Sequence, residues 1–477
     1  MKDLLNYFSD RILKRLRKFG VSVPTKAILH ELIRVSYFAS LSTEEGRFVR
    51  ASLTYADPEK PDLDPPFTRR AHYPHITSLG KHQPLTVKSI VKLGRAVDNW
   101  SGSIAVWGTT SKSLVTWGIV DQMVSTNVRM HHERASGFRY LGVLTIAIDG
   151  VANISVYHHN FFLGGLRADN LVNHQSDAFR ALVVAERIAP SLAPVASCIA
   201  KALDAPRKTP AILRNYIDSW SDTLARLCIG LRRIGTGGSL LITPAPVSSA
   251  IQITTPFSYS RLGDSLALSV LDWQYQFKLG REYRALAPSK NLPWVFSARL
   301  NLAETDTEDR EIELSGAVKL VTSLASVDGL VLLTPMLSVL GFGAKIGPGP
   351  TVETVYDGPG FMRSGTRARK ADLSGFGTRH TSMLRYCCAD PDSVGIVVSQ
   401  DGNVRMIMSI DRCLTLWGNV KLIGYSNYSD QAARHERQRR VRRAREKHSV
   451  KLGYSPVPKT VASLLELGEK AKLITSA

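Results

Sequence analysis

The sequence has no long apolar run. Its most apolar stretches, such as Ser239–Thr243 and Val327–Leu333, are five to seven residues long, whereas a membrane-spanning helix needs about 20. The first 20 residues interleave charged with apolar side chains, unlike a secretion signal. We therefore expect a cytoplasmic protein that has neither a membrane span nor a signal peptide.

Cysteine is scarce as well. The 477 residues include 5 cysteines and no Cys-x-x-Cys pair, which argues against a disulfide framework and agrees with a reducing compartment. The sequence also has no Gly-x-Ser-x-Gly elbow and no His-Glu-x-x-His motif. These absences argue against a serine hydrolase of the α/β-hydrolase type and against a zinc peptidase.

Acidic residues are too few to balance the basic ones: 61 Lys and Arg against 41 Asp and Glu give a net charge of +20. Part of the excess lies in residues 434–447, where eight basic side chains face Glu436 and Glu446. Such a segment attracts nucleic acid or another polyanion, although a solvated charged helix has the same composition. A polyanion is therefore a candidate partner of this tail.

The chain is long enough for several domains, and the pattern of short strands and amphipathic helices predicts a multidomain α/β protein of the α+β kind. The strand-rich and helix-rich stretches suggest four parts. We expect an N-terminal helical region with a proline-rich linker over 1–84 and an α+β sensor or regulatory domain over 85–305. A second domain with a mixed sheet flanked by helices is expected over 306–425, and a basic helical tail over 426–477.

The second domain has the clearest local signals. Periodicity predicts a helix over 312–324, a buried strand over 328–333 and a helix over 378–386. The glycine-rich span 341–377 is expected to be largely loop, and 394–399 with 404–408 to form a hairpin. Upstream, Gly235-Thr236-Gly237-Gly238 predicts a tight turn from a helix into the strand 239–243.

Two short motifs in this domain carry chemistry. Asp328 stands beside Gly329 where a helix gives way to a strand, an arrangement suited to a divalent cation close to the backbone. Gly377-Thr378-Arg379-His380 opens a helix, and a helix N-terminus together with an arginine favours phosphate. The two motifs together predict a nucleotide triphosphate site.

Their order resembles the diadenylate cyclase (DAC) domain. That family has Asp-Gly-Ala on a strand, Gly-Thr-Arg-His-Arg at the start of a helix, and a strand that ends in Val-Ser-Glu-Glu. The chain has Val-Asp-Gly-Leu at 327–330, Gly-Thr-Arg-His-Thr at 377–381 and Val-Ser-Gln-Asp at 398–401. The resemblance covers about 310–415 and suggests a divergent member that follows an N-terminal sensor domain.

The resemblance implies that two ATP molecules, held by two domains face to face in a homo-oligomer, condense to cyclic di-AMP with the help of Mg²⁺ or Mn²⁺. Such a cyclic dinucleotide is a second messenger in bacterial signalling. By this carry-over the catalytic residues are Asp328, Arg379 and His380, and the metal ligands are Asp328, His380 and Asp401. The residues that contact the nucleotide are Gly329, Leu330, Gly377, Thr378, Thr381, Ser399 and Gln400.

Three positions depart from the family pattern: Leu330 replaces an alanine, Thr381 an arginine and Gln400 a glutamate. Two other functions therefore stay open. The domain can be a catalytically inactive nucleotide-binding regulator, or the chain can bind nucleic acid through its arginine-rich tail. The choice of ATP over another nucleotide rests on the family resemblance alone.

Overall fold

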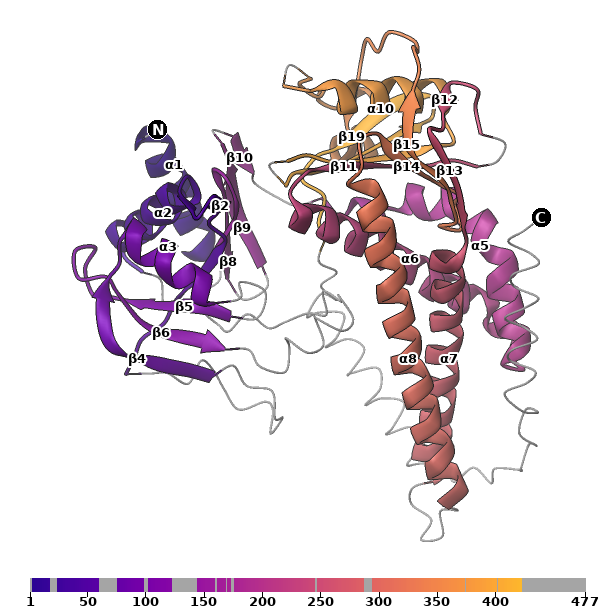
Figure 1. The fold of residues 1–477 in the computed structure, drawn as a ribbon, viewed down its shortest axis with the longest axis horizontal. Coiled ribbons are helices and arrows are strands. Elements are labelled where there is room, and N and C mark those ends of the chain that lie inside the picture. Colours follow the sequence, from indigo (N-terminus) through magenta and orange to yellow (C-terminus); the bar gives the residue numbers. More distant parts are fainter. Residues whose placement is uncertain are drawn as a thin grey trace. The chain divides into compact units, whose positions relative to one another are not determined.

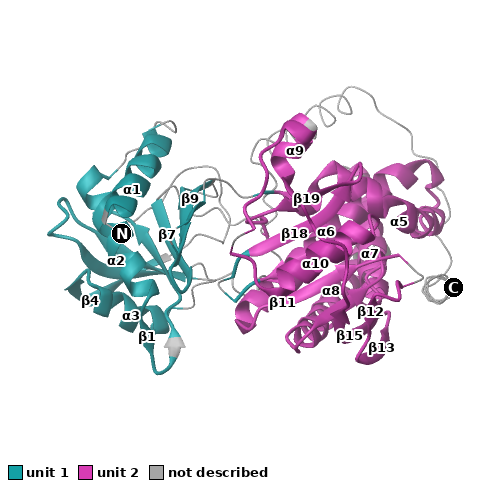
Figure 2. Cartoon of the chain, turned by 90° about the horizontal axis from the view of Figure 1, so that it is seen from above, with its two compact units in different colours: residues 1–176, 399–403 teal, residues 177–398, 404–477 magenta. Residues whose placement is uncertain are grey.

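The computed structural model divides the chain into two compact units (Figure 2). Unit 1 comprises residues 1–176 with 399–403, and unit 2 comprises 177–398 with 404–477. The residues that the structure describes are 2–17, 24–59, 75–97, 102–121, 144–158, 161–168, 170–172, 176–244, 247–286, 294–373, 375–400 and 402–422.

Unit 1 is built on an eight-stranded sheet of order β10-β9-β8-β7-β3-β5-β6-β4. Strands β3 and β5 run parallel, and the other neighbours are antiparallel. The two strands β1 and β2 form a separate hairpin. The elements are α1 (Lys2–Arg17), α2 (Lys26–Ser40), β1 (Thr43–Glu44), β2 (Arg47–Phe48), β3 (Ala51–Tyr55), β4 (His75–Pro84), α3 (Val87–Ala96), β5 (Gly102–Trp107), β6 (Val115–Asp121), β7 (Leu144–Gly150), β8 (Asn153–His158), β9 (Phe161–Arg167) and β10 (Asn170–Val172).

The first helix of unit 1 packs into that unit's own core. Leu5, Phe8, Ile12 and Leu16 recur every three or four residues, and each is at most 2% exposed. They share one hydrophobic cluster with apolar residues of α2, α3 and the sheet. The amphipathic pattern of this segment is thus explained by burial in the protein.

Unit 2 has a nine-stranded mixed sheet. Its order is β12-β15-β14-β11-β17-β18-β19-β16, and β13 pairs with β15. The central strand β11 runs parallel to β14 and antiparallel to β17. The strands are β11 (Gly238–Ile242), β12 (Ile251–Gln252), β13 (Thr255–Tyr259), β14 (Leu330–Leu333), β15 (Val339–Ile346), β16 (Tyr356–Asp357), β17 (Val394–Val398), β18 (Val404–Ile410) and β19 (Cys413–Trp417).

Helices cover both faces of this sheet (Figure 1): α10 lies on one face, and α6 and α8 lie on the other. All five residues of β11 are buried, as expected for a strand between two helical layers. The helical elements are η1 (Ala178–Arg180), α5 (Leu182–Ala202), η2 (Pro206–Lys208), α6 (Thr209–Ile234), α7 (Arg261–Leu286), α8 (Trp294–Ala325), α9 (Gly358–Ser364), η3 (Gly365–Arg367) and α10 (Thr378–Ala389).

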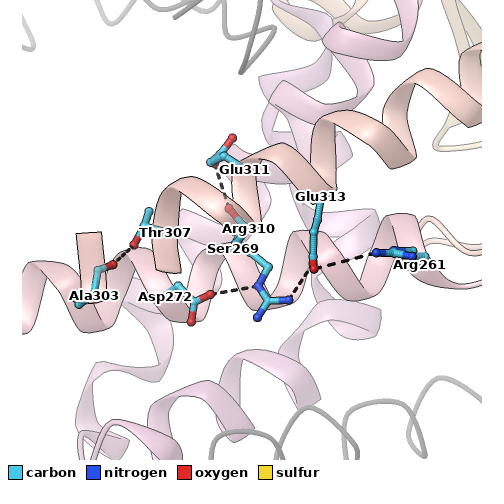
Figure 3. Close-up of polar contacts among 8 residues, drawn as sticks. All are labelled: Arg261, Ser269, Asp272, Ala303, Thr307, Arg310, Glu311 and Glu313. Carbon is cyan, nitrogen blue, oxygen red and sulfur yellow. Dashed lines mark hydrogen bonds and ion pairs between the residues drawn. The ribbon is translucent and has the colours of Figure 1, made fainter. Parts of the chain in front are cut away.

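A polar network joins α6, α7 and α8, and Figure 3 shows its contacts between α7 and α8. Arg226 of α6 donates to the carboxylate of Glu311 in α8 at 3.0 Å, and both side chains are 5% exposed. Ser269 of α7 donates to the other oxygen of Glu311, also at 3.0 Å. Nearer the surface, Arg310 binds Asp272 at 3.1 Å. These contacts determine how α8 lies against the other two helices, and the candidate site begins three residues after α8 ends.

The predicted fold class is confirmed, because the structure is a multidomain protein of helices and mixed sheets. The observed division differs from the predicted boundaries at 84/85 and 305/306. Strand β3 lies before the first of these and pairs with β5 after it. Strand β11 lies before the second and pairs with β14 after it. The basic tail 426–477 lies outside the described residues.

Several local predictions agree with the structure. The helix at 378–386, the hairpin of β17 and β18, and the turn between α6 and β11 are all present. The span 341–377 is more regular than expected, since it contains most of β15 as well as β16 and α9. Its many glycines predicted loop, because glycine is rare in strands. The pairing of β15 with β14, which makes this span a strand, depends on residues outside it.

One helix among the described residues, α5, is long and apolar enough to cross a membrane by length and composition. Its buried residues include Val184, Ile188 and Leu192, at a spacing of four, and the helix packs against α6. A helix in a protein core has the same length and composition, so a single such helix is weak evidence for a span.

Candidate functional site

Asp328 lies in the turn between α8 and β14, with its side chain 95% exposed. One carboxylate oxygen accepts a hydrogen bond from the backbone N–H of Gly329 at 3.0 Å. Gly329 has a φ of +107°, and a Cβ atom there would lie 2.6 Å from the carbonyl carbon of Gly343. The fold itself therefore requires glycine beside Asp328, whose carboxylate lies two residues before the buried strand β14.

The N-terminus of α10 carries the second motif. Gly377 is the N-cap residue and provides no side-chain cap. Thr378 is the first helical residue and is exposed, and the hydroxyl of Thr381 donates back to the carbonyl of Gly377 at 3.3 Å. The first backbone N–H groups of a helix have no partner within it, so this end of α10 favours an anion.

Arg379 joins the two motifs. Its guanidinium lies 3.7 Å from the carboxylate of Asp328 and donates to the carbonyl of Thr236 at 3.3 Å. Thr236 belongs to the glycine turn between α6 and β11, so three separate segments meet around this one side chain. The Arg379 side chain is 38% exposed, and an exposed ion pair of this kind contributes about 0–1 kcal/mol. A phosphate can therefore replace Asp328 as the partner of Arg379 at little cost.

His380 is the buried residue of the second motif. It is 8% exposed, and its Nε2 lies 2.9 Å from Nη1 of Arg405 in β18. A guanidinium donates and cannot accept, so Nε2 is the acceptor and the imidazole proton lies on Nδ1. In this arrangement Nε2 has no lone pair for a metal ion. The geometry therefore supports a positioning role for His380 and does not support the predicted metal ligand.

Arg405 is a residue that the sequence analysis missed. Its guanidinium stacks over the ring of Phe376 at 5.0 Å, and the rings of Phe376 and His380 are 4.8 Å apart. A signal was present, because Arg405 is the one charged residue in the strand Val404–Ile410, directly after the hairpin turn. The structure thus places a second guanidinium under the first turn of α10, where the motif at 377–381 has only one.

The remaining predicted residues lie in different surroundings. Leu330 is 5% exposed and belongs to the core beneath α10, so it does not line an open surface. Ser399 closes the hairpin turn, where its N–H and its hydroxyl both donate to the carbonyl of Asn403. Gln400 is exposed at the tip of this turn. Asp401 and the basic segment 434–447 lie outside the described residues.

The donor set limits how a metal could bind. The described residues contain no group of three or more His, Cys, Asp or Glu side chains placed to hold a metal ion. Asp328 is a single, solvent-facing carboxylate. Mg²⁺ commonly takes one or two protein carboxylates and completes its shell with substrate phosphates and water. The site therefore fits a cation that arrives with a nucleotide, and it does not fit a permanently bound structural metal.

Comparison with known proteins bears on the N-terminal part of the chain. A family described as "Probable sensor domain DACNV" matches residues 20–121. No curated protein and no solved structure matches the chain. The matched residues run from before α2 to the end of β6 and lie wholly in unit 1. The N-terminal part therefore contains a domain similar to a sensor domain, as the sequence predicted, but the match begins before the predicted sensor bounds of 85–305 and ends well inside them.

Proposed function

We propose that unit 2 carries a diverged diadenylate cyclase site that condenses two ATP molecules into cyclic di-AMP or a related cyclic dinucleotide, under the control of the sensor domain in unit 1. The observation that carries the proposal is the approach of Arg379 to Asp328 at 3.7 Å, from positions 51 residues apart in the sequence, beside an uncapped helix N-terminus. The sensor-domain match agrees with a regulated enzyme.

The chemistry follows from positioning and charge. Arg379 and the N–H groups in the first turn of α10 would hold the phosphates, and Asp328 would accept the proton of the attacking 3′-hydroxyl. The new 3′-oxygen bond to the α-phosphate would replace the bond between the α- and β-phosphates, and pyrophosphate would leave. Mg²⁺ or Mn²⁺, bound by Asp328 together with the phosphates, would neutralise negative charge at the α-phosphate. Arg405 would keep the His380 ring fixed beneath the helix N-terminus. Two copies of unit 2, face to face, would each present one ATP to the other, so the active species would be a homo-oligomer in the cytoplasm.

Product formation tests the proposal. We expect the purified full-length chain with ATP and Mn²⁺ or Mg²⁺ to form a cyclic dinucleotide that mass spectrometry detects. Asp328→Asn should lower its rate by about a hundredfold or more, as expected on loss of a general base. Asp411→Asn is the matched control: Asp411 is an exposed aspartate with a φ of +49° in the turn after β18, a conformation that asparagine adopts readily.

If wild type forms no more product than Asp328→Asn with either metal, the cyclase proposal fails. A second function, nucleotide binding without turnover, is favoured by the replacements at Thr381 and Gln400, which remove a cation and an acid from the family pattern. Saturable ATP binding that Arg379→Ala weakens, with no product from wild type, would support this regulator. Absence of both binding and product would exclude the two functions together.

A further inference from the structure

The helix pair α7 and α8 already receives one arginine from another helix. Arg226 of α6 donates to the carboxylate of Glu311 in α8, and Ser269 of α7 donates to the same carboxylate. Farther along, Arg299 of α8 donates to the hydroxyl of Tyr275 in α7 at 3.4 Å. These contacts show that α7 and α8 run antiparallel and stay paired beyond the point where Arg226 enters.

Beyond that point the surface of α7 is aromatic. Trp273 and Phe277 lie four and eight residues after Ser269, on the same side of the helix. They are 40% and 42% exposed, and their rings stack at a centroid distance of 5.6 Å. Exposed aromatic rings attract a guanidinium, and tryptophan does so most strongly.

The matching surface of α8 is acidic. Glu308 and Glu304 lie three and seven residues before Glu311, on its side of the helix. Both are exposed, and neither has an ion pair or a hydrogen bond from its side chain among the described residues. Like charges four residues apart in a helix repel each other, so a cation beside these two carboxylates is stabilising. We call the surface formed by Trp273, Phe277, Glu304 and Glu308 the α7–α8 face.

The chain contains a segment with the complementary chemistry. Residues 434–447 have seven arginines and one lysine against Glu436 and Glu446. A guanidinium binds a carboxylate through two parallel hydrogen bonds and also lies flat on an aromatic ring, so arginine suits both halves of the α7–α8 face. The described chain ends at Leu422, and residues 423–433 can extend roughly 40 Å. This reach is about the length of the 26-residue helix α7.

We propose that residues 434–447 dock on the α7–α8 face of their own chain. Their arginines would pair with Glu304 and Glu308 and lie over Trp273, as Arg226 pairs with Glu311. A nucleic acid or another polyanion would then have to displace α8 in order to bind the tail. The proposal does not depend on the chemistry of the candidate cyclase site and holds whether or not unit 2 forms a cyclic dinucleotide.

Tryptic cleavage of the full-length chain tests the docking, because trypsin cuts after arginine only where the segment is accessible. Cleavage within 434–447 is followed over time by mass spectrometry at about 50 mM NaCl, where exposed charges are weakly screened. We expect the variant with Glu304→Gln and Glu308→Gln to be cut about fivefold faster or more. The matched control carries Glu186→Gln and Glu353→Gln, two exposed glutamates of the same unit. It makes the same change in charge and should alter the rate less than about twofold.

Trp273→Leu is a second variant, which also serves should the double variant fail to fold. It keeps an apolar side chain but removes the ring, and it should raise the cleavage rate about two- to fivefold. Protection of the wild-type segment should not depend on chain concentration. The proposal is overturned by equal rates in wild type and both variants, by protection that grows with chain concentration, which indicates docking on a second copy, or by protection that requires added duplex DNA.

Discussion

Truncation of Arg226 to alanine is expected to destabilise the helical layer of unit 2 strongly. The side chains of Arg226 and Glu311 are both 5% exposed, and their guanidinium and carboxylate are 3.0 Å apart. Removal of one partner of a buried ion pair typically costs about 3–5 kcal/mol, because the other charge stays buried without it. Part of this loss is the desolvation of Glu311, although Ser269 still donates a hydrogen bond to its carboxylate.

The matched control is Arg261→Ala. Arg261 is an arginine of the same network (Figure 3), but its side chain is 64% exposed and lies 4.0 Å from Glu313. An exposed pair contributes about 0–1 kcal/mol. The pair of variants therefore separates the effect of burial from the loss of one arginine.

Hydrogen exchange measured by mass spectrometry over a denaturant series is the suitable assay, because it reports opening free energies for peptides of α6 and α8 within the full-length, multidomain chain. The reasoning also predicts that the combined variant Arg226→Met, Glu311→Leu and Ser269→Ala is close to wild type or more stable, since no buried charge remains. Equal losses in Arg226→Ala and Arg261→Ala, or a combined variant as unstable as Arg226→Ala, would refute it.

Three further predictions concern the candidate site and its surroundings. Gly329→Ala should destabilise unit 2 by about 2–4 kcal/mol, because residue 329 has a positive φ and an added Cβ would meet neighbouring backbone. Hydrogen exchange of β14 measures this loss. Gly375→Ala, whose Cβ would meet no atom within 4 Å, should be nearly neutral, and equal losses in the two variants would contradict the prediction. Burial raises the pKa of the Cys387 thiol to about 12, so iodoacetamide at pH 8 should label the exposed Cys388 and spare Cys387. Labelling of both cysteines in the folded chain would show that Cys387 is not buried. The unfolded thiol loses its proton above its ordinary pKa of 9.0, whereas the folded chain keeps it up to a pKa of about 12. The thiol of Cys387 therefore lowers the stability of the folded chain as pH rises from about 9 to 12. Thr381→Arg restores the family's second arginine and should tighten ATP binding several-fold in equilibrium dialysis; unchanged affinity would argue against the carry-over of that motif.

Local patterns predicted a substantial part of unit 2. The glycine turn at 235–238, the buried strand that follows, the helix opened by Gly377 and the hairpin before Val404 were all evident in the sequence. Each depends on interactions within a few residues: glycine accepts the +82° φ of the helix end at 235, and alternation or three-to-four spacing marks the strand and the helix. For the same reason the motif residues Asp328 and Arg379 could be singled out before their distance was known.

The pairing of strands that are distant in the sequence could not be predicted from local patterns. Nothing near Leu240 indicates that β11 inserts between β14 and β17, because an all-apolar strand has no face that specifies its partner. The predicted boundary at 305/306 failed to anticipate this pairing, and the predicted boundary at 84/85 likewise divides strands of the first sheet. The pairing of Arg405 with His380, across 25 residues, was hidden for the same reason.

The sequence by itself determined the composition of the candidate site and the type of most elements around it, because backbone propensity, turn chemistry and side-chain type are local properties. The tertiary structure decided which of those residues face solvent. It brought Arg379 to within 3.7 Å of Asp328, placed Leu330 in the core and paired His380 with Arg405. These outcomes depend on how the sheet of unit 2 and its helices share buried surface, and only the packed chain specifies that.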